Sequence, residues 1–191
     1  AAFGEWGIDE ALDSLSASGK SLIVVGIDNG GEKRMSEYNP YAYDQVGKGE
    51  GKEYVEYLVE TLKPFIDENY RTKRDAAHTY IAGSSMGGLI SFYAILEYPK
   101  VFGAAGIFSP AFWTAPQLYD EAKKKSAAAK GKFYFYAGGS ETKTMVSDMQ
   151  QIIDMLRHNS SAEIKVEINQ EGRHNESNWR REFPKFYEWI N

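Results

Sequence analysis

The chain has 191 residues, of which 42% are hydrophobic and 26% charged, and this suits a globular domain with a sizeable core. Its net charge of −5 gives no basic face for a nucleic-acid partner. The absence of cysteine excludes disulfides, thiolate catalysis and cysteine-ligated zinc, and no apolar run approaches the length of a membrane span.

The predicted elements alternate between strands and helices along the chain. The apolar run at residues 21–28 predicts a buried strand, and residues 53–70 carry apolar side chains at helical spacing, with Pro64 as a point of kinking or division. The remaining strands are predicted at residues 78–83, 102–110, 132–139 and 163–170, and the remaining helices at residues 86–98, 116–129, 143–159 and 176–190.

This alternation is typical of a mostly parallel sheet with right-handed crossovers, so we expect one α/β domain over residues 1–191. The alternating pattern of residues 163–170 favours a place near a sheet edge. In such sheets the functional residues lie beyond the carboxyl ends of the strands.

The most informative motif is Gly83-Ser84-Ser85-Met86-Gly87, a G-x-S-x-G that follows a predicted strand and precedes a predicted helix. This context is typical of a nucleophile elbow, which projects its serine, here Ser85, from the end of the sheet. The N–H of Met86, at the positive end of the helix, would then be an oxyanion donor. The alternatives are a tightly packed glycine-rich turn or a phosphate-binding loop, although the Lys-Ser/Thr of a Walker motif is absent.

A serine nucleophile needs a general base, and the chain has three histidines. His78 begins the strand that leads into the elbow and is expected at the opposite end of the sheet from Ser85. His158 is expected at a helix C-terminus, where a cation is favourable for structural reasons. His174 follows the last predicted strand, so it is the expected base, with a surface or capping role as the alternative.

The acid of such a triad lies between serine and histidine in the chain, after a strand. Glu141, just after the predicted strand at residues 132–139, fits this order. It would hold the imidazole in its working tautomer and stabilise the imidazolium. The alternatives are an exposed loop glutamate or a carboxylate at a helix N-terminus.

Four stretches, taken with these residues, resemble the esterase D-like branch of the α/β-hydrolases, which includes trilactone siderophore hydrolases and feruloyl and acetyl esterases. They are EWGIDEALD, IVVGIDNGGEKRMSEYNPY, YIAGSSMGGLISFYAILEYPKVFGAAGIFSPAFW and GRHNESNW. The resemblance implies an α/β-hydrolase-like three-layer sandwich with Ser85 as nucleophile, His174 as base and Glu141 as acid. It also implies that residues 34–41 and 109–113 border the pocket.

Arg34, Tyr38 and Trp113 are therefore the expected substrate-binding residues. Arg34 would meet a substrate carboxylate or phenolate, and Trp113 would stack on a ring. The alternatives are a solvated arginine that pairs with Glu37 and a tryptophan in a satellite core.

The chain departs from the family pattern at its start. Members of the branch usually carry further strands before this point, the last of which ends in an Asp-Gly loop that supplies a second oxyanion N–H. We therefore expect an N-terminally incomplete domain whose oxyanion hole keeps only the Met86 donor, at a cost in turnover. An open sheet edge would invite self-association. The lack of cysteine and a first residue other than methionine slightly favour an exported protein, although trimming explains the start equally well.

The predicted function is a serine esterase that cleaves carboxylic esters of a small-molecule or carbohydrate-linked substrate through an acyl-enzyme. No metal or organic cofactor is expected, because the scattered histidines lack ligand spacing. Neither nucleic acid nor a membrane is expected as a partner. The alternatives are an acyltransferase with the same triad and a non-catalytic ligand-binding relative.

Overall fold

A parallel sheet of four strands, in the order β1-β2-β3-β4, forms the centre of the molecule. The computed structural model describes residues 4–15, 21–45 and 47–191. The strands are β1 (Tyr80–Ser84), β2 (Ala104–Phe108), β3 (Lys132–Gly138) and β4 (Glu163–Asn169). Because all four run in the same direction, their carboxyl ends lie along one side of the sheet.

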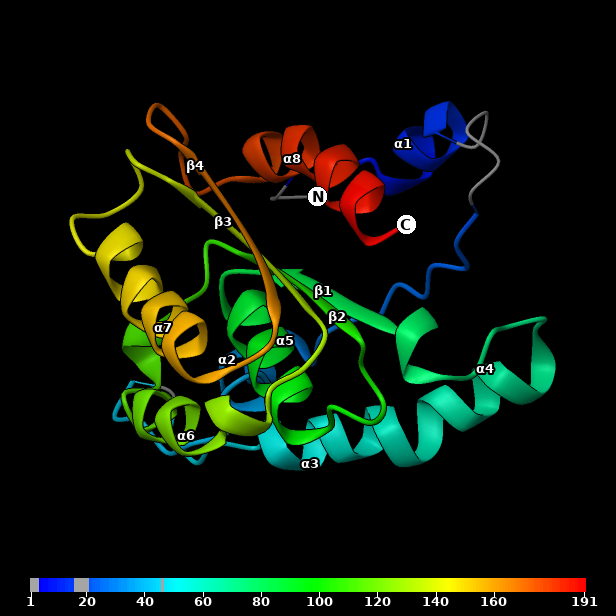
Figure 1. Ribbon diagram of the computed structural model, residues 1–191, viewed down its shortest axis with the longest axis horizontal. Helices are drawn as coiled ribbons and strands as arrows, with labels where there is room; N and C mark the ends of the chain where they lie inside the picture. Colours follow the sequence, from blue (N-terminus) through cyan, green and yellow to red (C-terminus); the bar gives the residue numbers. More distant parts are fainter. Residues whose placement is uncertain (1–3, 16–20, 46) are drawn as a thin grey trace.

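Helices cover both faces of this sheet, which gives the three layers that the sequence predicts (Figure 1). On one face lie α5 (Met86–Glu97) and α7 (Met145–Asn159), and on the other lie α8 (Glu176–Ile190) and α1 (Ile8–Leu15). The other helices are α2 (Arg34–Glu37), α3 (Gly51–Tyr57), α4 (Lys63–Asn69) and α6 (Gln117–Lys125). Short 3-10 turns occupy Gly31–Lys33, Ala76–His78, Phe112–Thr114 and Ser126–Ala128.

The side chains of β3 alternate between two hydrophobic cores. Phe133 and Phe135 join the core beneath α5, where both rings contact Phe92 at centroid distances of 6.2 and 6.1 Å. Tyr134 and Tyr136 join the core beneath α8. A strand that is apolar on both faces must be covered on both faces, which explains why this sheet lies between two helical layers.

The predicted division near Pro64 is confirmed. The chain runs from α3 through a π-helical turn at Leu58–Leu62 into α4, and Pro64 is the second residue of α4. Proline has no N–H and its ring crowds the carbonyl four residues earlier, so a wider turn at this point relieves the conflict.

Residues 21–28 do not form the predicted strand. The structure gives them no regular secondary structure, and Ile23, Val24, Val25 and Ile27 are exposed. Their β-branched side chains favour a strand, but a buried strand also needs neighbours that pair with its backbone N–H and C=O groups. None of the described strands pairs with this segment, so the described sheet has four strands instead of the expected five.

The described sheet ends at two unlike edges. β4 is one edge strand, as its alternating pattern predicts. β1 is the other, and its residues are half-buried or exposed, whereas every residue of β2 is buried. Within the described ranges β1 pairs with β2 alone, so its far side carries unpaired backbone groups. Self-association through this edge stays a prediction.

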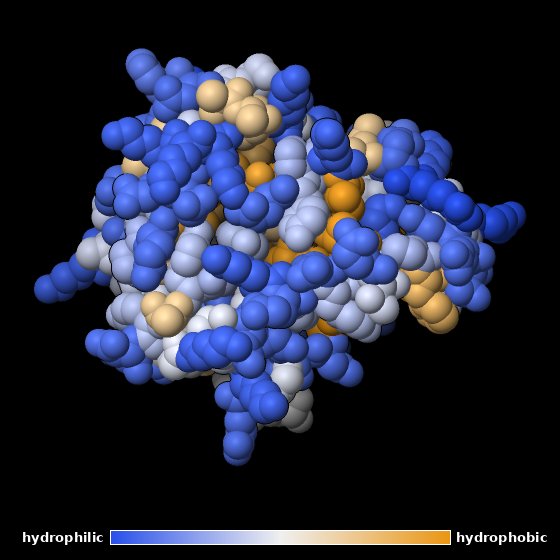
Figure 2. Space-filling model, turned by 90° about the horizontal axis from the view of Figure 1, so that it is seen from below, coloured by the Kyte–Doolittle hydropathy of each residue, from blue (hydrophilic) through white to orange (hydrophobic). Residues whose placement is uncertain are grey.

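The outer surface of the helical layer that includes α3 and α6 is mostly polar. Figure 2 shows hydrophilic side chains over most of this face, with apolar residues visible mainly in the recesses between them. None of the described helices combines the length and the apolar character that a membrane crossing requires.

Candidate active site

The turn between β1 and α5 consists of one residue, Ser85, in a rare backbone conformation. Its φ of 58° and ψ of −119° lie outside the regions that residues with a side chain usually adopt. Three backbone hydrogen bonds hold it: Ser85 N donates to Phe108 O (2.9 Å), and Ser85 O accepts from Leu89 N (3.1 Å) and Ala111 N (3.0 Å). The strained serine is therefore tied to the end of β2 and to α5.

Gly83 of the motif and Gly88, which directly follows the motif, allow the strand and the helix to approach this closely. A Cβ at Gly83 would lie 2.7 Å from the carbonyl carbon of Gly87, and a Cβ at Gly88 would lie 2.8 Å from Phe108 O. Both contacts are to backbone atoms, which cannot turn aside as a flexible side chain would. The absence of a side chain at positions 83 and 88 thus has a steric cause, whereas a Cβ at Gly87 would meet nothing within 4 Å.

The N-terminus of α5 begins directly after Ser85. Met86 is its first residue and is buried, and N–H groups in a first helical turn have no carbonyl partner within the helix. The positive end of the helix dipole lies at the same place. This end of α5 is suited to stabilise negative charge that develops beside Ser85.

Glu141 and His174, which are 33 positions apart in the chain, are joined by a hydrogen bond. His174 Nδ1 lies 2.7 Å from Glu141 Oε2, and the Glu141 side chain is fully buried whereas that of His174 is 32% exposed. Oε1 of Glu141 accepts two further hydrogen bonds, from Ser109 Oγ (2.6 Å) and Gly138 N (2.6 Å). The alternative of an exposed loop glutamate is therefore wrong.

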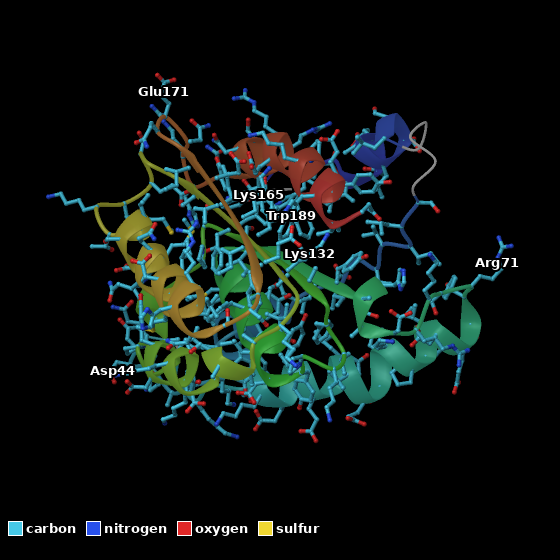
Figure 3. The ribbon with its side chains drawn as sticks, in the orientation of Figure 1. Asp44, Arg71, Lys132, Lys165, Glu171 and Trp189 are labelled. Atoms are coloured by element: carbon cyan, nitrogen blue, oxygen red, sulfur yellow. The ribbon has the colours of Figure 1, made fainter. Side chains whose placement is uncertain are left out.

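The loops after β3 and β4 bring these two residues together because they lie against each other. Ser140 N donates to Gly172 O (3.0 Å), and the backbones approach so closely at Gly138 and Gly172 that neither position has room for a Cβ. Glu171 marks the outer end of the β4 loop in Figure 3, far from Lys132 at the start of β3. The pair thus lies at the carboxyl ends of the strands.

The elbow and the Glu141–His174 pair meet at the carboxyl end of β2. Ser109, which bonds Glu141, directly follows Phe108, whose carbonyl accepts from Ser85 N. In the described chain no hydrogen bond joins Ser85 Oγ to His174. The nucleophile candidate and the paired imidazole thus share one end of the sheet without a hydrogen bond between them.

The other two histidines lie elsewhere. His78 belongs to the turn before β1, at the amino end of the sheet, and its Nδ1 lies 2.8 Å from Asp75 Oδ1. His158 is exposed in the last turn of α7. Both positions agree with the sequence-based expectation for these residues.

The pKa of Tyr136, in β3, reflects both burial and the nearby charge of Glu141. Burial raises the pKa of Tyr136 to about 12, and the carboxylates of Glu182 and Glu141 add to this effect. The phenol therefore stays neutral at ordinary pH, beside a buried carboxylate that the surrounding donors must stabilise.

Arg34 and Tyr38 lie against each other in and after α2. The Arg34 guanidinium carbon is 5.5 Å from the centroid of the Tyr38 ring. Glu37 accepts a hydrogen bond from Gly30 N (2.7 Å), and within the described segments Arg34 makes no ion pair, so the alternative of an Arg34–Glu37 pair is wrong. Tyr38 is buried with its ring 4.9 Å from that of Tyr54, and burial raises its pKa. Their role toward a substrate stays a prediction.

Trp113 lies in the 3-10 turn after β2 and is 42% exposed, so the alternative of a tryptophan in a satellite core is wrong. Next to it, Thr114 O accepts a hydrogen bond from the buried Asn39 Nδ2 (2.7 Å). This bond joins the stretch at residues 34–41 to the residue that directly follows the stretch at residues 109–113, and both stretches are expected to border the pocket. Contact of Trp113 with a substrate stays a prediction.

The contacts that two residues of this region make with the Glu141–His174 pair were not expected from the sequence. Ser109 and Trp179 are both buried, and Trp179 Nε1 donates to Ser109 Oγ (2.9 Å). The sequence does place Ser109 directly after a predicted strand, where functional residues are expected. Its two partners, Glu141 and Trp179, are distant in the chain, and no local pattern predicts these contacts.

No metal centre is evident in the described ranges, because no group of three or more histidine, aspartate and glutamate side chains is placed to hold an ion. The arrangement that is present consists of a strained serine at a helix N-terminus and a buried carboxylate paired with an imidazole. Such groups serve acyl transfer.

Comparison with known proteins identifies the family of the chain. The family model described as "Putative esterase" matches residues 1–190. The chain belongs to this esterase family. A family of ester hydrolases is also what the sequence motifs predict.

Individual relatives are distant. The chain is 26% identical over 187 residues to the uncharacterized protein YbbA of Bacillus subtilis, which covers 88% of this chain and 73% of YbbA. It is 31% identical over 111 residues to an endo-1,4-beta-xylanase/feruloyl esterase of Xylanibacter ruminicola, a match that covers 57% of this chain and 14% of that much longer protein. The IroE-like serine hydrolase of Shewanella oneidensis superposes with a TM-score of 0.74 at 16% identity, over 94% of this chain and 67% of that one. This last likeness confirms the α/β-hydrolase-like fold.

Proposed function

We propose that this protein hydrolyses carboxylic esters through an acyl-enzyme on Ser85, with His174 as general base and Glu141 as the acid that orients it. The observation that carries the proposal is the 2.7 Å hydrogen bond between His174 Nδ1 and the buried carboxylate of Glu141, at the same end of the sheet as the strained Ser85. A buried carboxylate that accepts from Nδ1 is the arrangement that orients the imidazole of a serine hydrolase to accept a proton.

The Glu141 contact determines which imidazole nitrogen can react. A carboxylate can only accept a hydrogen bond, so the ring proton is on Nδ1, which donates to Glu141 Oε2. In the neutral ring Nε2 then holds the free lone pair and is the atom that takes the proton of Ser85. The buried carboxylate stabilises the imidazolium that forms.

The reaction proceeds in two halves. Ser85 Oγ attacks the acyl carbon while His174 Nε2 takes its proton, and the N–H of Met86 donates to the oxyanion of the tetrahedral intermediate. The C–O bond to the alcohol breaks, the proton passes from His174 to the departing oxygen, and the acyl group stays on Ser85. Water then attacks the acyl carbon, gives a proton to His174, and releases the acid as Ser85 regains its hydrogen.

Arg34 and Trp113 are proposed to face the substrate, whereas Tyr38 is buried in the core beside Arg34. Arg34 has no ion-pair partner in the described chain, so its charge is available to an anionic or phenolic group. The exposed ring of Trp113 is available for stacking. We infer a small-molecule or carbohydrate-linked ester with an aromatic or acidic acyl part.

The test compares wild type with Ser85→Ala on p-nitrophenyl acetate and butyrate, and follows labelling by a fluorophosphonate. Wild type should turn over and be labelled, while Ser85→Ala should lose both, with a fall in kcat of at least about a thousandfold. Ser84→Ala is the matched control, because it removes the neighbouring hydroxyl and should keep both activity and labelling. Equal turnover by Ser85→Ala and wild type would rule the proposal out.

A further inference from the structure

A closed chain of contacts links Trp179, Ser109, Glu141 and His174. Trp179 Nε1 lies 2.9 Å from Ser109 Oγ, Ser109 Oγ lies 2.6 Å from Glu141 Oε1, and Glu141 Oε2 lies 2.7 Å from His174 Nδ1. The imidazole then meets the ring of Trp179 edge to face, with centroids 5.0 Å apart and an interplanar angle of 87°. Trp179 thus donates to Ser109 at one end of this series of hydrogen bonds and contacts the His174 ring at the other end.

The direction of each hydrogen bond in this chain follows from donor chemistry. The indole N–H can only donate, so Ser109 Oγ must accept it. The single proton of the hydroxyl is then directed to Glu141, which can only accept. Ser109 is fully buried, so no bulk water competes for either bond. Trp179 thereby sets the orientation of a hydroxyl that holds one oxygen of the carboxylate.

The backbone at Ser109 is unfavourable for a residue with a side chain. Its φ of 44° is in the left-handed region, where glycine would be the relaxed choice. The hydrogen bond from Ser109 N to Tyr136 O (2.7 Å) helps to hold this conformation. A serine at a position that favours glycine indicates that its hydroxyl is required there.

Trp179 itself is held firmly. It is buried in the first turn of α8, in the core that also contains Phe183 and Phe108, and its ring lies 6.1 Å from that of Trp6. A rigid ring against the imidazole restricts the rotation of His174, while its N–H fixes the hydroxyl on the other side of the pair.

We propose that Ser109 and Trp179 are positioning residues of the esterase site, which act on the reaction through Glu141 and His174. Ser109 holds Glu141 Oε1 so that Oε2 is directed at the imidazole, and Trp179 holds both the Ser109 hydroxyl and the imidazole ring. This inference rests on the proposed function. Gly138 N supplies the second donor to Oε1, so the carboxylate keeps one donor when Ser109 is changed.

The first experiment is a double-mutant cycle on kcat and on the rate of fluorophosphonate labelling. Ser109→Ala should lower kcat about tenfold with KM unchanged, which corresponds to the loss of one hydrogen bond to a charged group. In a Glu141→Ala background the same change should have no further effect, because Ser109 acts only through that carboxylate. An equal loss in both backgrounds would overturn the proposal.

Two further variants separate positioning from general packing. Trp179→Phe keeps an aromatic ring but removes the N–H, and it should lower kcat about threefold with KM unchanged. Ser126→Ala is the matched control, because Ser126 is equally buried but bonds only the backbone of Lys123, and it should leave kcat unchanged. A fall in kcat for Ser126→Ala as large as for Ser109→Ala would assign the effect to packing and overturn the proposal.

A second readout does not depend on activity. The NMR signal of the His174 Nδ1 proton should shift in Ser109→Ala and in Trp179→Phe, and should stay in place in Ser126→Ala. An unchanged signal in the first two variants would overturn the positioning role. If wild type is neither labelled nor active, the proposed function fails, and this signal still decides whether Ser109 and Trp179 hold the Glu141–His174 pair.

Discussion

β3 and residues 21–28 are both short apolar runs in the sequence, yet they end in opposite environments. β3 lies between β2 and β4, hydrogen-bonded to both, and all its residues from Phe133 to Gly138 are buried. Residues 21–28 pair with none of the described strands and expose four large aliphatic side chains. An apolar pattern thus indicates a preference for burial, and the presence of pairing partners decides whether the preference is met.

The proposed site also has a region rich in hydrogen-bond partners, around Glu141, and a region with few, around Arg34. The loops after β2, β3 and β4 carry a network in which both carboxylate oxygens of Glu141 have hydrogen-bond partners. The stretch after residues 21–28 carries Arg34, whose charge has no ion-pair partner in the described chain. We therefore expect the loops around Glu141 to hold the proposed catalytic residues in place, and Arg34 to be free to meet a substrate.

The largest effect is expected at the loop after β4. His174→Ala should lower kcat on p-nitrophenyl acetate by about 10⁴-fold or more, because Ser85 loses its general base. His158→Ala is the matched control and should leave kcat unchanged, since His158 is exposed at the end of α7. Comparable losses in both variants would contradict the assignment of the base.

The next effect concerns the buried sheet. Ile107, in β2, is fully buried, and Ile107→Ala should lower the free energy of unfolding by about 2–5 kcal/mol. Urea denaturation followed by fluorescence measures this change. If the free energy of unfolding falls no more than for a substitution at the surface, the sheet must relax to fill the space that the isoleucine leaves.

A smaller effect is expected at the elbow. Gly83→Ala should lower the free energy of unfolding by about 1–3 kcal/mol, because the new Cβ meets the backbone of Gly87 at 2.7 Å. The matched control, Gly87→Ala, has open space around its Cβ and should stabilise α5 by up to about 1 kcal/mol. The same sign in both variants, measured by thermal unfolding, would refute the steric argument.

The smallest effect is expected in residues 21–28, the apolar run that is exposed. Ile23 is 52% exposed, so Ile23→Ala, the same substitution as in β2, should change the free energy of unfolding by less than about 0.5 kcal/mol. A cost near that of Ile107→Ala would show that residues 21–28 are buried in solution.

Much of the fold follows from local pattern. Residues 132–138 and 145–159 form the strand and the helix that the sequence predicts, and Pro64 divides its helix as expected. These predictions succeed because β-branched and aromatic runs, helical spacing and proline act within a few residues of themselves. The strand predicted at residues 21–28 fails because pairing is not a local property.

For the site, the sequence alone determined the position of Ser85 between a strand and a helix and placed Glu141 and His174 after later strands. These are consequences of chain order, which parallel strands convert into a common end of the sheet. Only the tertiary structure decided that Glu141 is buried, that Ser109 and Trp179 hold it, and that Tyr38 lies in the core. Those contacts join residues between 16 and 70 positions apart, and packing between separate elements, which no local pattern encodes, selects them.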